Sequence, residues 1–181
     1  PKLRNERLNS GIVTAANFIN FNPTYFYNVG IGTSYNNPAL QAPDNTCDRM
    51  RFIQLGTSGL TMFSNMGYQF ASVANRWYNA AGNSIAEVKD GFGTGGYVAV
   101  GNITNNPLTE ANGIPGNSDI LFARINSAGM VITARRIDLN QSTDAAWCIR
   151  RSVTLFNGQP TWLICGQSQR GNQFTDCFVA R

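Results

Sequence analysis

The most informative absence in this 181-residue chain is histidine, which does not occur at all. Histidine is the commonest general base and the commonest zinc ligand, so the sequence can build no Ser-His-Asp or Cys-His site. The ten carboxylates form no paired motif. Glycosidase chemistry needs two carboxylates, but nothing in the sequence supports Glu87 and Glu110 as such a pair. We therefore expect a protein that is not an enzyme and has no cofactor.

Charge and long apolar runs are also scarce. Charged residues make up 13% of the chain, and the net charge of +4 comes from scattered Lys and Arg. The densest pairs are Arg135–Arg136 and Arg150–Arg151, whose members would point to opposite faces of a strand, which favours solvated arginines over a nucleic-acid surface. No run approaches the roughly 18 apolar residues of a membrane span. We expect neither nucleic acid nor a membrane span.

Glycine and aromatic residues, in contrast, are plentiful, with 18 Gly and 11% Phe, Trp and Tyr. With many Asn and few charges, this composition is typical of an all-β, loop-rich protein. One pattern occurs three times: an alternating run, a Ser-Gly-type turn and a second alternating run, as expected for a β-hairpin. The copies are "RLNSGIVTAANFI" (7–19), "QLGTSGLTMFSNMG" (54–67) and "RINSAGMVITARRI" (124–137).

A second marker gives the same period as the hairpins. Gly32, Gly101 and Gly166 lie in related segments and are 69 and 65 residues apart, while the turn glycines Gly59 and Gly129 are 70 apart. Two independent markers therefore indicate an internal repeat of about 65–70 residues.

Each repeat predicts four antiparallel strands joined by short turns. The first strands are 13–20, 83–90 and 144–152; the second are 24–32, 96–103 and 161–168; the third are 48–55, 118–125 and 174–181; the fourth are 60–68 and 130–137. The third repeat lacks a fourth strand, and we interpret residues 1–10 as that missing outer strand. The chain then forms one domain, 1–181, with repeats at about 12–70, 83–138 and 144–181. Residues 1–19 also align as a hairpin of third and fourth strands, which leaves an alternative open.

Four antiparallel strands per repeat are the pattern of a β-propeller blade. The segment "GGYVAVGNIT…SDILFARINSAGMVITARRI" resembles the repeat propellers of secreted and cell-surface bacterial proteins, especially those of the Bacteroidota. The shared features are a Gly-Gly-Tyr-hydrophobic strand, a hydroxyl-Asp pair opening the next strand and an Asn-x-x-Gly hairpin, best preserved in residues 95–181. The resemblance implies a propeller-type fold and an extracellular or cell-surface location. It implies no catalytic residues.

Three blades do not close a ring, because propellers need about four to eight. Two apolar blade faces would stay open. The sequence leaves three alternatives: a six-bladed ring of two chains, an open polymer or filament, or a longer chain. We expect the N-terminal strand to complete the last blade, in the same chain or in a neighbouring one. Its residues in that assembly are Lys2, Leu3, Arg4, Asn5, Glu6, Arg7 and Leu8.

The four cysteines are disulfide candidates: Cys47, Cys148, Cys165 and Cys177. Cys165 and Cys177 flank the connection centred on Gly171, so antiparallel pairing about that centre would place them nearly opposite, within disulfide reach. Four cysteines allow three connectivities. A cysteine left over could bond to a neighbouring molecule.

Two further segments are candidate ligand sites. "DLNQSTD" places Asp138, Asn140, Ser142 and Asp144 at alternate positions, an oxygen-rich loop that suits a structural calcium ion, although a turn closed by Asx hydrogen bonds explains it equally. The insertion "NRWYN" carries ring faces and amides suited to sugars, namely Asn75, Trp77, Tyr78 and Asn79.

Two functions fit these features. The first is a non-catalytic extracellular structural protein that assembles with itself through open blades and its terminal strand. The second is a lectin-like propeller that binds glycans with its long loops. A propeller lectin would repeat its sugar-contacting aromatics in every blade, whereas "NRWYN" occurs once. The sequence therefore favours self-assembly.

Overall fold

Alternating apolar and polar residues fold into β-strands throughout the described part of the chain. The computed structural model describes residues 6–19, 22–34, 49–56, 62–68, 70–71, 77–90, 93–105, 118–139, 143–170 and 174–181. Within these ranges every regular element is a strand, so the prediction of an all-β antiparallel fold is confirmed. The same ranges contain no helix able to span a membrane.

The strands form three antiparallel sheets, and each strand pairs with its neighbours in sequence. The first sheet contains β1 (Glu6–Ile19), β2 (Asn22–Ser34), β3 (Arg49–Gly56) and β4 (Met62–Tyr68). The middle sheet contains β5 (Phe70–Ala71), β6 (Trp77–Asp90), β7 (Gly93–Asn105), β8 (Asp119–Ile125) and β9 (Val131–Ile137). The third sheet contains β10 (Thr143–Arg151), β11 (Trp162–Arg170) and β12 (Phe174–Ala180). The strands predicted within the three repeats are therefore present, the described part of the predicted N-terminal strand is continuous with β1, and the two-residue β5 was not expected.

The N-terminal segment does not behave as predicted. Glu6, Arg7 and Leu8 belong to β1 and pair with Ser34, Thr33 and Gly32 of β2, so the expectation that they complete the last sheet of their own chain is wrong. The Asn-Ser-Gly signal after Leu8 makes a register shift within one long strand instead of a turn, which also rules out the alternative hairpin within residues 6–19. Lys2, Leu3, Arg4 and Asn5 lie outside the described residues.

The glycines that mark the repeat share one structural setting. In each sheet the first long strand carries one extra residue, a β-bulge, beside the marker glycine of the next strand: Asn9 beside Gly32, Asn83 beside Gly101 and Trp147 beside Gly166. A Cβ on Gly101 would overlap the carbonyl oxygen of Ala81, and a Cβ on Gly166 would overlap that of Ala145. In these two sheets the position therefore favours glycine, because the bulge brings the neighbouring backbone close to where a side chain would begin.

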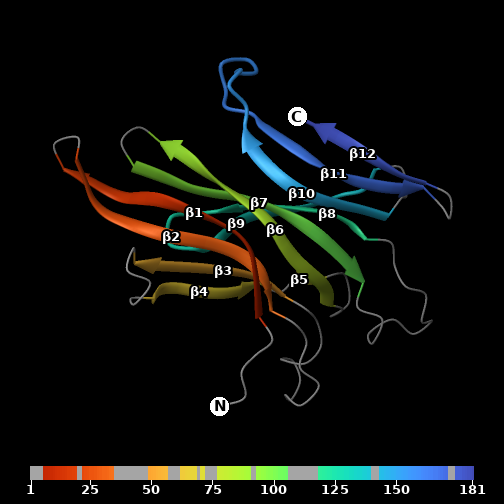
Figure 1. Cartoon of the computed structure of the whole chain (residues 1–181), viewed down its shortest axis with the longest axis horizontal. Coiled ribbons are helices and arrows are strands. Elements are labelled where there is room, and N and C mark those ends of the chain that lie inside the picture. Colours follow the sequence, from red (N-terminus) through yellow and green to blue (C-terminus); the bar gives the residue numbers. More distant parts are fainter. Residues whose placement is uncertain are drawn as a thin grey trace, which may run out of the picture.

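The core lies on both faces of the middle sheet, which separates the first sheet from the third (Figure 1). Side chains alternate along β7, so Tyr97 packs towards the first sheet and Val98 towards the third. The ring of Tyr97 lies 5.4 Å from that of Phe52 in β3, centroid to centroid. On the other face, Ala146 and Ile149 of β10 join the same cluster as Val98. Sheet-on-sheet packing thus holds the three sheets in a row.

Candidate functional site

The face of the third sheet that points away from the middle sheet carries large apolar side chains. The opposite face is packed, because Ile164 and Phe178 join the core shared with the middle sheet. On the outward face Leu163 is 41% exposed, Trp147 51% and Val179 75%. An open apolar face, expected from the repeat count, is therefore present at this end of the row of sheets.

The open face has a buried counterpart within the same chain. Counted from the marker glycines, Leu163 and Cys165 occupy the positions that Val98 and Val100 occupy in the middle sheet. Across the strands, Val179 pairs with Cys165 as Phe122 pairs with Val100. Val98, Val100 and Phe122 belong to the cluster that packs on the third sheet. The open face thus repeats, position by position, the face by which the middle sheet holds its neighbour.

Polar contacts beside the bulge fix the distance between the two sheets. The side-chain amide of Asn83, the bulged residue of β6, donates to the carbonyl oxygen of Ala146 at 3.0 Å. The backbone N–H of Ile149 donates to the hydroxyl of Ser84 at 3.2 Å. Sequence reasoning missed both residues, and the signal that could have found them is their place opposite the repeated glycine.

The hairpin between β10 and β11 carries further exposed apolar side chains, Val153, Leu155 and Phe156. Its turn residues Asn157 and Gly158 have φ values of 48° and 75°, which an Asn-Gly pair adopts readily. Phe156 is exposed, and the guanidinium of Arg181 lies 5.9 Å from the centre of its ring. The hairpin therefore exposes apolar side chains beyond the ends of the two strands.

Three cysteines lie on the third sheet, and the structure corrects their expected pairing. Cys165 is opposite Val179, and Cys177 is opposite Gln167, so the predicted placement of Cys165 opposite Cys177 is wrong. The pairing is centred one residue later than Gly171, and such a shift moves each partner by two residues. Cys165 instead faces Cys148 across β10 and β11. All three thiols are free, and Cys47 lies outside the described residues.

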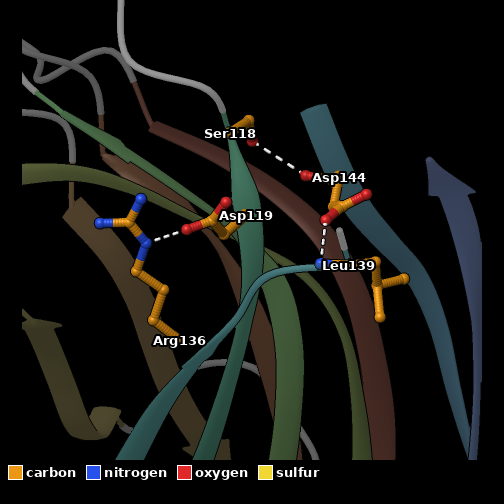
Figure 2. Close-up of polar contacts among 5 residues, drawn as sticks. All are labelled: Ser118, Asp119, Arg136, Leu139 and Asp144. Carbon is orange, nitrogen blue, oxygen red and sulfur yellow. Dashed lines mark hydrogen bonds and ion pairs between the residues drawn. The ribbon is translucent and has the colours of Figure 1, made fainter. Parts of the chain in front are cut away.

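A cluster of three aspartates lies where the middle and third sheets meet, and Figure 2 shows two of them, Asp119 and Asp144. Asp119 opens β8, Asp138 follows β9, and Asp144 lies in β10, with one carboxylate oxygen of each within 4.8 Å of the others. The predicted metal ligands Asp138 and Asp144 are therefore close together, while Asn140 and Ser142 lie outside the described residues.

The contacts in this cluster tie three strands together. Asp119 forms an ion pair with Arg136, and the N–H of Leu139 donates to Asp144 at 2.7 Å. The hydroxyl of Ser118 donates to the carbonyl oxygen of Asp144 at 3.0 Å. Calcium takes about six to eight oxygen ligands, of which the cluster offers three carboxylates, one already paired with an arginine. The contacts described here therefore act as a junction between β8, β9 and β10.

The predicted sugar-binding residues that the structure describes, Trp77, Tyr78 and Asn79, lie in a strand and not in a connection. Trp77 begins β6 opposite Ala71, Tyr78 is opposite Asn105, and Asn79 is opposite Thr104. Asn75 lies outside the described residues. Glycan binding by these residues stays a prediction.

Comparison of the chain with family models and with curated proteins found no match. The resemblance of residues 95–181 to bacterial propeller repeats therefore stays a prediction.

Proposed function

We propose that this protein is a non-catalytic structural protein that assembles with copies of itself through the open face of the third sheet. In this proposal the three sheets are three propeller-type blades, and the protein works outside the cell, as the resemblance of its repeat implies. The single observation that carries the proposal is that Leu163, Cys165 and Val179 repeat a face that is already an interface in the middle sheet.

The chemistry of the face supports a protein partner. Fully burying a leucine or valine side chain contributes roughly 1.5–3 kcal/mol, so covering the exposed apolar residues would stabilise an assembly. Exposed apolar patches on a folded protein often mark sites of protein–protein interaction. A second copy fits because its sheets carry the same bulge, glycine and strand spacing as the sheets already packed in this chain.

The edge of the third sheet offers a second contact. β12 is the last strand of a three-stranded sheet, whereas the first and middle sheets continue with β4 and β9 at the equivalent edge. An unpaired strand edge is a template for an added strand. A segment from a second copy, including Pro1–Asn5, would supply the strand that the third sheet lacks.

The mass of the purified chain in solution tests the proposal. Light scattering should show a dimer, as in a closed six-bladed ring, or larger polymers, and Leu163→Asp should reduce either to monomer. Ile132→Asp is the matched control, because Ile132 is an exposed apolar residue of β9 in another sheet, and it should leave the mass unchanged. Deletion of Pro1–Asn5 shows whether the added strand comes from that segment. A wild-type chain that stays monomeric at high concentration would contradict the proposal.

A further inference from the structure

Three thiols cross the open face of the third sheet, one on each of its strands. Cys148 lies on β10, Cys165 on β11 and Cys177 on β12. Cys148 is directly opposite Cys165, whereas Cys177 is opposite Gln167, two residues further along β11. Cys165 on the central strand therefore has one direct and one diagonal cysteine neighbour.

Cross-strand geometry favours the direct pair over the diagonal pair for a disulfide. Directly opposite residues have Cβ atoms about 4.5–5.5 Å apart, and diagonal neighbours are roughly 7 Å apart. A disulfide needs a Cβ separation of about 3.5–4.5 Å. The direct pair therefore has to approach by about 1 Å, and the diagonal pair by about 3 Å, which a hydrogen-bonded sheet resists.

The environment of Cys165 agrees with a close direct pair. Burial raises the pKa of the Cys165 thiol, and the neighbouring Cys148 raises it further by electrostatic repulsion and by a side-chain hydrogen bond. Such a hydrogen bond requires the two side chains to be in contact. Cys177, in contrast, is exposed, and its effect on Cys165 is the last and smallest contribution.

We propose that Cys148 and Cys165 form a disulfide by exchange with a small disulfide such as oxidised glutathione, while Cys177 stays a free, exposed thiol. One cysteine thiolate attacks a glutathione sulfur, which forms a mixed disulfide and releases one glutathione thiolate. The second cysteine thiolate attacks the protein sulfur of the mixed disulfide and releases the second glutathione. The two thiol protons pass to the released glutathione thiolates, so two cysteines are oxidised and one glutathione disulfide is reduced to two thiols.

The disulfide would lie beside the β-bulge that interrupts the pairing of β10 with β11. Cys148 directly follows the bulged Trp147, and its equivalent in the middle sheet, Ser84, accepts a hydrogen bond from the next sheet. A disulfide there would fasten β10 to β11 where the bulge interrupts their pairing. The inference depends on strand register and contact within one chain, so it does not require that copies assemble.

Peptide mapping of the unmutated protein is the first test. Trypsin cleaves after Arg136, Arg150, Arg151 and Arg170, so the three cysteines of the third sheet fall into separate peptides. After equilibration with oxidised and reduced glutathione, the cross-linked pair should join residues 137–150 to residues 152–170. A cross-link from 152–170 to 171–181 would overturn the proposal.

Two double variants give a matched comparison. Cys47→Ser with Cys177→Ser keeps only the direct pair and should lose both thiols, stay a single chain on a non-reducing gel and melt about 5–10 °C higher than its reduced form. Cys47→Ser with Cys148→Ser keeps only the diagonal pair and should retain both thiols at the same glutathione ratio. The proposal fails if the direct pair stays reduced, if the diagonal pair closes as readily, or if the bonds join different chains. Light scattering of the reduced protein is unaffected by these results, so the assembly proposal is judged separately.

Discussion

The middle and third sheets have the same local design and opposite surroundings. Both carry a bulge opposite a glycine at which an added Cβ would overlap the neighbouring backbone. Val98 of the middle sheet is buried under the third sheet, whereas Leu163, at the equivalent position, faces solvent. The nearby sequence therefore determines the strand, the bulge and the glycine of each sheet. Whether the face is buried depends on whether a further sheet packs on it.

The largest expected effect comes from placing a charge at these equivalent positions. Val98→Asp should destabilise the folded chain by about 3–5 kcal/mol, because it buries an unpaired carboxylate between two sheets. Leu163→Asp should cost less than about 1 kcal/mol, since its carboxylate reaches water. Urea unfolding of dilute protein measures both. Similar losses at the two positions would show that the third sheet is covered in solution in the same way as the middle sheet.

The glycines sharpen the comparison at the level of the backbone. Gly101→Ala should cost about 3 kcal/mol, because the added Cβ meets the carbonyl oxygen of Ala81 in a sheet confined on both faces. Gly166→Ala should cost about 1–2 kcal/mol, since the third sheet is packed on one face only and its strands can adjust more readily around the added Cβ. Thermal unfolding followed by circular dichroism measures the difference. A larger loss at Gly166 would mean that the third sheet is the more confined of the two.

The strands and their repeat period could be predicted because short segments of the sequence carry both signals. Alternation, turn glycines and a glycine repeated every 65–70 residues need no knowledge of distant partners. The error at the N-terminus shows the limit, because the Asn-Ser-Gly signal after Leu8 fits a turn and a bulge equally well. Only the pairing with β2 decides between them.

The candidate sites could be predicted less well, because they depend on register and on contacts between repeats. One residue of error in the centre of the β11–β12 hairpin moved the expected partner of Cys165 from Val179 to Cys177. The aspartate cluster combines residues of β8 and β10, which belong to different repeats. No local pattern of Asp119 or Asp144 reports that these strands meet.

The aspartates at equivalent positions of β8 and β12 give the next comparison. Asp119 and Asp176 lie two residues past the marker glycine when traced across the sheet, opposite Ile103 and Ser168. Asp119→Asn should cost about 1–2 kcal/mol, because it removes the charge that faces Arg136 at a buried position. Asp176→Asn should change stability by less than about 0.5 kcal/mol, since Asp176 is exposed. Equal effects would show that the two aspartates serve the repeat itself and not the junction of two sheets.

The smallest expected effect concerns Cys165, the counterpart of Val100. Burial, followed by the neighbouring Cys148, raises the pKa of Cys165, so the folded chain holds this proton more firmly than the unfolded chain. The contribution of the Cys165 thiol to stability is therefore complete below the ordinary cysteine pKa of about 8.5. This contribution is lost as the pH rises through the raised pKa of Cys165 in the folded chain. The urea midpoint of the reduced protein should fall slightly between about pH 8 and pH 10. Cys165→Val, which restores the residue of the middle sheet, should remove this slope. If the urea midpoint of Cys165→Val still falls over this pH range, another titrating group causes the pH dependence. The position of Cys165 would then contribute no more to it than the position of Val100.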